Sequence, residues 1–266
     1  MTTTPANCEP GLEGRTSSRI GLIVPSSNTT METELPELFR RQSSMTGDSY
    51  TFHSARAAMK HVNTEELLAM VGKASECSAA VSDADVDVIA YACLVAVMAQ
   101  GPGAHRASEE AIAKAAADNG HSAAVVSSAG ALVRALGQLG ARRVAIVTPY
   151  VPALTKLVCD YIEGEGISVI DSVALGVADN LAVGRLDTAQ LPQLARDLDR
   201  DGVDAIVLSA CVQMPSLAAV QVVEDELGLP VITAATATAF EVLTSLGHTP
   251  TVASAGALLR GTAVRP

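Results

Sequence analysis

The sequence predicts an α/β protein of two pseudo-symmetric lobes, each a parallel sheet flanked by helices, with the active site in the cleft between them. Short apolar segments alternate with longer segments whose apolar residues recur at helical spacing, as in βαβ units. The order of these segments occurs twice along the chain. Aromatic residues make up only 3% of the sequence, and a core of small side chains suits helices packed closely on parallel sheets.

The first half of the chain contains four predicted strands, each an apolar run followed by a polar loop or a helix. Asn63 fits the start of a helix, because its side chain can accept hydrogen bonds from the first N–H groups. Glu65 and Glu66 then lie in the first turn, where the positive end of the helix dipole stabilises their carboxylates. Gly120 and Gly140 fit helix ends. The predicted strands are 19–25, 50–57, 86–92 and 123–127, and the predicted helices are 30–41, 63–80, 108–119 and 129–139.

The second half restarts the same pattern. Pro149 ends a strand as Pro25 does, 124 positions earlier, and Val203-Asp-Ala-Ile echoes Val86-Asp-Val-Ile at a separation of 117. The predicted strands here are 142–149, 167–173, 203–209 and 231–233, and the predicted helices are 151–163, 191–201, 216–227 and 234–246. The chain is therefore interpreted as two copies of one α/β unit, with a small net deletion in the second.

The predicted boundaries follow from this repeat. We expect a disordered leader over residues 1–18, a first lobe over 19–140, a second lobe over 141–235, and a closing helix and tail over 236–266. The leader is polar and has no apolar core, so it does not resemble a secretory signal. No apolar run reaches the roughly 18 residues that cross a bilayer. A cytoplasmic protein is expected, with no membrane partner.

The charge of the chain argues against nucleic acid as a partner. The formal net charge is −11, and no run of Lys and Arg supplies the basic stripe that binds phosphates. An anionic ligand would need local donors, such as loop amides, that overcome the acidic surface.

Two of the five cysteines occupy matched positions in the two halves. Cys93 and Cys211 each follow a buried strand, and ligands of open parallel sheets bind beyond the carboxyl ends of the strands. No CxxC pair is present and the histidines are scattered, so no metal site is predicted. The remaining cysteines are interpreted as structural: Cys8 in the leader, and Cys77 and Cys159 within helices.

Polar residues also follow strands. Asn28 lies in the loop Pro25-Ser-Ser-Asn-Thr-Thr30, where it could cap the next helix or contact a ligand. Tyr150 follows the matching strand of the second half, and Asn180 lies in a predicted long loop. Arg56, with His53 at the end of another strand, is interpreted as a solvated charge or a lid salt bridge.

These stretches resemble a known family. Gly21-Leu-Ile-Val-Pro-Ser-Ser-Asn-Thr-Thr-Met-Glu32, together with Phe52-His-Ser-Ala-Arg56, is similar to the maleate isomerases of the aspartate/glutamate racemase superfamily, and the resemblance spans roughly residues 18–250. It implies an Asp/Glu racemase-like fold and a homodimer that acts on a small dicarboxylate, maleate, without a metal or cofactor.

The resemblance also implies roles for eight residues. Cys93 matches the nucleophile and Cys211 the second catalytic thiol, usually the proton donor. The residues matched to binding of the substrate carboxylates are the side chains of Asn28, Tyr150 and Asn180 and the backbone amides of Leu94, Val95 and Val212.

The implied reaction is the isomerisation of maleate to fumarate through a covalent succinyl-cysteine-like intermediate on Cys93. Cys211 either protonates the carbanion or holds an enediolate by a hydrogen bond, and the sequence leaves both open. The alternatives are an amino-acid or hydantoin racemase that uses two cysteines as acid and base, an isomerase of another diacid, and a non-catalytic dicarboxylate-binding protein. A decarboxylase fits less well, because the arylmalonate type uses one thiol.

Overall fold

The computed structural model describes residues 17–261, and its first half forms a four-stranded parallel sheet. The strand order is β2-β1-β3-β4. The apolar residues that predict these strands are buried: β3 is covered along its whole length. The strands are β1 (Ser17–Pro25), β2 (Ser49–Ala57), β3 (Val88–Tyr91) and β4 (Ala124–Ser127).

The second half repeats this sheet. Its strand order is β6-β5-β7-β8, again all parallel, so each strand occupies the place of its counterpart in the first sheet. The strands are β5 (Arg143–Thr148), β6 (Ser168–Ala174), β7 (Ala205–Ser209) and β8 (Val231–Thr233). The predicted pair of pseudo-symmetric parallel sheets is confirmed.

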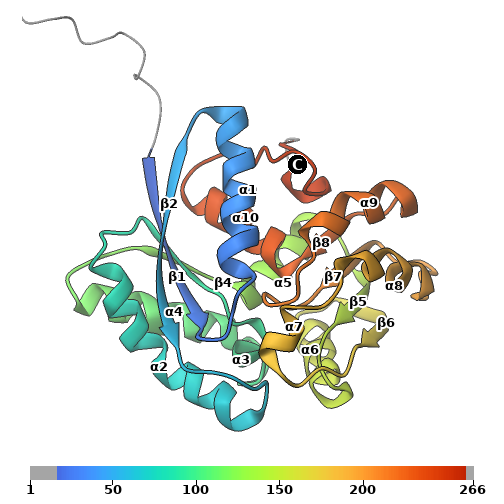
Figure 1. The fold of residues 1–266 in the computed structure, drawn as a ribbon, viewed down its shortest axis with the longest axis horizontal. Helices are drawn as coiled ribbons and strands as arrows, with labels where there is room; N and C mark the ends of the chain where they lie inside the picture. Colours follow the sequence, from blue (N-terminus) through green and yellow to red (C-terminus); the bar gives the residue numbers. More distant parts are fainter. Residues whose placement is uncertain (1–16, 262–266) are drawn as a thin grey trace, which may run out of the picture.

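Helices pack on both sheets (Figure 1). They are α1 (Met31–Thr46), α2 (Thr64–Ser82), α3 (Leu94–Met98), α4 (Ala104–Asp118), α5 (Ser128–Gln138), α6 (Pro152–Gly164), α7 (Asn180–Val183), α8 (Leu191–Asp197), α9 (Leu217–Leu227) and α10 (Ala234–Ser245), with 3₁₀ turns η1 (Thr188–Gln190) and η2 (Ala257–Leu259). The predicted cap of α2 is confirmed, because the Asn63 side chain accepts a hydrogen bond from Glu66 N–H. Helix α10 packs on α5 and α1 and contacts strands of both sheets.

Two short helices differ from the sequence prediction. All five residues of α3 are buried, so the segment lacks the polar face from which a helical period is recognised. Asn180 was predicted in a long loop, which is wrong: it is the first residue of α7, whose N-terminus is capped by the Asp179 side chain.

Most other differences lie at element ends. Helix α4 begins at Ala104 rather than 108, because Gly103, with a φ of 70°, turns the chain directly before it. Helix α8 ends at Asp197 rather than 201. Ser17 and Ser18 belong to β1, so the strand begins inside the predicted leader, whose residues 1–16 lie outside the described residues. The division of the chain into lobes stays a prediction. Among residues 17–261, no helix is long and apolar enough to cross a membrane.

The strand order places two loops side by side in each sheet. In each sheet the chain reverses its direction of winding between the first and third strands, and such switch points form crevices at the carboxyl ends of the strands. The loops after β1 and β3 begin with Pro25 and Cys93, and those after β5 and β7 lead to Tyr150 and Cys211.

Candidate active site

The structure brings all eight predicted site residues to one cavity. Both halves of the chain contribute to its wall. The walls are formed by Pro25, Asn28, Met59, Val62, Cys93, Leu94, Val95, Tyr150, Asn180, Cys211, Val212 and Gln213. Most of these side chains are buried, so the cavity is closed over in this conformation.

Cys93 lies at the start of α3, directly after β3. Its side chain is 2% exposed, and the sulfur accepts a hydrogen bond from the backbone N–H of Ala96. Burial raises the pKa of the Cys93 thiol to about 12. The Ala96 N–H lowers this pKa, but by less than burial raises it. The neutral thiol is therefore the resting form near neutral pH.

Cys211 lies after β7 and has more hydrogen-bond donors. Its sulfur accepts hydrogen bonds from the Tyr150 hydroxyl and from the backbone N–H groups of Gln213, at 3.3 Å, and Met214. Burial raises the pKa of the Cys211 thiol, while these three donors oppose the rise. Because hydrogen bonds to sulfur favour the anion, this is the better supported of the two thiolates.

Tyr150 supplies the side-chain donor to Cys211. It follows β5 by one proline and is 2% exposed. Burial raises the pKa of its phenol well above the usual value, and the neighbouring Cys211 and Cys93 thiols raise it further. The hydroxyl therefore keeps its proton and acts as a donor.

Asn28 supports the start of α1 and also lines the cavity. Its Oδ1 accepts hydrogen bonds from the N–H groups of Thr30 and Met31, at 3.1 and 2.9 Å, and so caps the start of α1. Its Nδ2 donates to the Val212 carbonyl at 3.2 Å. With Oδ1 fixed by the helix, Nδ2 is held in the cavity wall.

Asn180 enters the cavity from the other half. Its Nδ2 donates to Ser27 Oγ at 2.8 Å, and its backbone N–H donates to the Lys60 carbonyl at 3.2 Å. The Val62 N–H donates in turn to the Ala178 carbonyl at 3.1 Å. These backbone pairs join the segment after β2 to the segment before α7, and they close that side of the cavity.

Backbone amides at the cavity come from two strand ends. Leu94 and Val95 form the first turn of α3, where N–H groups have no carbonyl partner within their own helix. Val212 follows Cys211 directly and also lines the cavity.

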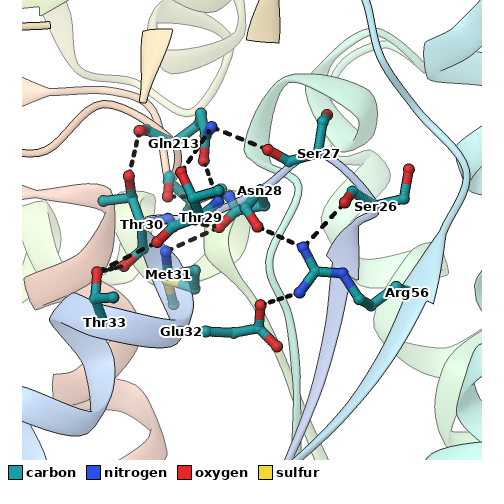
Figure 2. A network of polar contacts seen from close by, with 11 residues as sticks. Ser26, Ser27, Asn28, Thr29, Thr30, Met31, Glu32, Thr33, Arg56 and Gln213 are labelled. Carbon is teal, nitrogen blue, oxygen red and sulfur yellow. Dashed lines mark hydrogen bonds and ion pairs between the residues drawn. The ribbon is translucent and has the colours of Figure 1, made fainter. Parts of the chain in front are cut away.

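Several residues of the site were missed in the sequence. Met59 and Val62 line the cavity. Gln213, in the second half, donates a hydrogen bond from its side chain to the Ser27 carbonyl in the first half (Figure 2). A polar residue two positions after a strand-end cysteine was the only signal for Gln213. Arg56 donates to the carbonyls of Ser26, at 3.0 Å, and Asn28, at 2.5 Å, and pairs with Glu32, so it supports the loop after β1.

The other sequence candidates lie away from the cavity. His53 contacts Thr51 on β2, Cys77 is buried within α2, and Cys159 is half-buried in α6. Cys8 lies outside the described residues. Within residues 17–261, no three His, Cys, Asp or Glu side chains are grouped so as to hold a metal ion.

Comparison with known proteins shows which family the chain resembles. Residues 20–259 match the family model of arylmalonate decarboxylase. The chain is 51% identical to a maleate isomerase of Geobacillus stearothermophilus, over 91% of this chain and 97% of the relative. It is 53% identical to one of Pseudomonas putida over the same shares.

The chain belongs to the maleate isomerase family. Solved structures of maleate isomerases share its fold. That of Pseudomonas putida S16 with maleate superposes with a TM-score of 0.92 at 48% identity, covering 94% of this chain and all of that one. A Nocardia farcinica maleate isomerase variant with a covalently bound succinylcysteine intermediate gives 0.89 at 49% identity, covering 91% and 98%. The predicted racemase-like fold is confirmed.

Proposed function

We propose that the protein is a maleate cis–trans isomerase, which converts maleate to fumarate through a covalent succinyl-cysteine-like intermediate on Cys93. The observation that carries this proposal is a closed cavity that is lined by two buried thiols with unequal donor sets and by hydrogen-bonding residues from both halves. The covalent succinylcysteine in the Nocardia farcinica relative supports the intermediate.

Substrate binding is assigned to groups that donate hydrogen bonds. Maleate carries two carboxylates, and the Nδ2 groups of Asn28 and Asn180 reach the cavity from opposite halves. The amides of Leu94, Val95 and Val212 add further donors. Fixed dipoles in a site from which water is excluded bind an anion strongly, even on a chain of net charge −11.

The chemical step begins with a thiol pair that has lost one proton. In that pair the charge rests mainly on Cys211, which removes the proton of the Cys93 thiol. The Cys93 thiolate formed in this way makes a bond to one alkene carbon, and the π electrons move to the neighbouring carbon. Cys211 gives that carbon its proton, so the product is a succinyl thioether on Cys93 and a thiolate at Cys211. The donors in the site stabilise the charge that develops during this step.

The surroundings of the two sulfurs fit these end states. In the adduct the Cys93 sulfur is an uncharged thioether, and in the structure it has one backbone donor. Cys211 then carries the negative charge, and its sulfur has three donors, including the Tyr150 hydroxyl. This favours proton donation by Cys211 over a hydrogen bond alone.

The remaining steps reverse the addition. The former double bond is now single, so rotation about it brings the carboxylates to the trans arrangement. The Cys211 thiolate removes a proton from the carbon next to the thioether carbon, the double bond re-forms, and the Cys93 thiolate leaves. Fumarate is released and both thiols return to their starting states, with no net change of protons or electrons.

A cytoplasmic homodimer remains part of this proposal. The resemblance to the maleate isomerases supports the dimer. A reducing compartment suits a mechanism in which both thiols must stay reduced.

The assignment is tested by incubating the protein with maleate and following fumarate by proton NMR, with Cys93→Ser as the control. Fumarate from the wild type and none from the variant is the expected result. A folded wild-type protein with reduced thiols and no turnover contradicts the maleate assignment, and amino-acid and hydantoin racemisation would be assayed next.

A further inference from the structure

The side chain of Gln213 makes hydrogen bonds to three residues in two segments, the loop after β1 and the start of α7. Figure 2 shows its contacts with the loop after β1. Its Oε1 accepts from the Thr29 N–H at 2.8 Å. Its Nε2 donates to the carbonyls of Ser27, at 3.1 Å, and Asn180, at 2.8 Å. The carboxamide is 2% exposed, so these bonds form without competition from solvent.

The main chain of Gln213 adds two more contacts. Its N–H donates to the Cys211 sulfur at 3.3 Å, and its carbonyl accepts from Thr30 Oγ1 at 2.7 Å. One residue therefore bonds to the amino acids on both sides of Asn28, to the backbone of Asn180 and to the second thiol.

Gly184 leaves room for this arrangement. A methyl group at residue 184 would lie 2.6 Å from Gln213 Nε2 and 2.7 Å from Thr29 Oγ1. The φ of Gly184 is −67°, a value that any residue adopts. The glycine is therefore required for space beside the carboxamide rather than for backbone conformation.

We propose that Gln213 is a positioning residue for substrate binding, which holds the loop of Asn28 and the start of α7 at the spacing that two carboxylates need. This inference rests on the proposed function. The carboxamide acts on groups that contact the carboxylates before and after addition, so its loss weakens binding of substrate and intermediate alike. Such a loss raises KM more than it lowers kcat.

The test uses Gln213→Glu, which keeps the size of the side chain. A carboxylate cannot donate to the carbonyls of Ser27 and Asn180, whereas the protonated acid can. We expect KM for maleate to rise at least about tenfold near neutral pH, with kcat changed less than about threefold. The ratio of the variant's KM to the wild-type KM should fall as the pH is lowered, because the introduced carboxyl regains its donor.

The matched control is Gln42→Glu. Gln42 is also buried and also joins a carbonyl to an N–H, those of Thr249 and Thr251, far from the cavity. It should lower the melting temperature without moving KM. Gly184→Ala should displace the Gln213 carboxamide by steric contact, and it should therefore raise KM as Gln213→Glu does.

Each result decides one question. An unchanged KM in Gln213→Glu and Gly184→Ala, or an equal rise in Gln42→Glu, overturns the positioning role. If Gln213→Glu does not fold, Gly184→Ala alone decides it by the same KM criterion. Absence of turnover in the wild type overturns the proposed function itself, and with it this inference.

Discussion

The two halves of the molecule share one strand order but surround their cysteines differently. Cys93, after β3, has one backbone donor to its sulfur, whereas Cys211, after β7, has two backbone donors and the Tyr150 hydroxyl. Both thiols are buried to a similar extent, at 2% and 4% exposed. Burial therefore disfavours both thiolates, and the donors determine which sulfur better supports a negative charge.

The difference arises in the loops rather than in the sheets. After β1, Asn28 uses its amide to cap α1 and to contact Val212 of the opposite half. At the equivalent place after β5, Tyr150 reaches Cys211 in its own half. A repeated scaffold thus supplies two matched positions, and the loops give one sulfur the properties of a nucleophile and the other those of a proton carrier.

Replacing each cysteine in turn should have the largest effect and should separate the two roles. Cys93→Ser removes the nucleophile, and turnover should fall by at least about 10⁴-fold with no covalent adduct in mass spectra. Cys211→Ser should lower turnover by about 10³-fold. An adduct on Cys93 should accumulate, because the introduced hydroxyl can still give a proton during addition but is too weak a base for elimination.

The control for both variants is Cys77→Ser, which changes a buried thiol of α2 outside the cavity. It should keep turnover close to that of the wild type. An equal loss of turnover in Cys93→Ser and Cys211→Ser, with no adduct in either, would contradict the separate roles of the two thiols.

Raising the pH should have the next largest effect. The pKa of Cys93 is raised to about 12 and that of Cys211 is raised from its ordinary value of 9.0, so the pair is fully protonated near neutral pH. Since the active pair has lost one proton, kcat/KM should increase about tenfold per pH unit between about pH 7 and about pH 9. A plateau across that range in steady-state assays would show that a thiolate is already formed.

Tyr150→Phe should have a smaller effect on turnover, through the loss of its hydrogen bond to Cys211. Loss of one donor to the thiolate should lower kcat by about ten- to a hundredfold. Tyr161→Phe is the matched control, since the Tyr161 hydroxyl contacts His105 rather than the cavity. Steady-state kinetics of the two variants check this, and similar kcat values would show that the phenol of Tyr150 does not act on Cys211.

The sequence predicted the repeated fold because each strand carries its own local signal. Apolar runs such as Val88–Tyr91 are buried on both faces, and Asn63 marks the start of α2 by its capping chemistry. Local patterns failed for α3, which is apolar all round, and for α7, which is a single short turn.

The site could be predicted only in part. The two cysteines follow matched strands, so their meeting follows from the topology. The contacts of Gln213 with Ser27 and Asn180 join residues 186 and 33 positions apart. No local pattern encodes such contacts, because they depend on how two distant loops meet.

The central claim is that Cys211 supports a thiolate better than Cys93 does. It is tested most directly by following thiolate ultraviolet absorbance against pH in Cys93→Ser and Cys211→Ser, each compared with the double variant. We predict that Cys211, observed in Cys93→Ser, ionises at a lower pH than Cys93, observed in Cys211→Ser. Ionisation of Cys93 at the lower pH would contradict the assignment of the two roles.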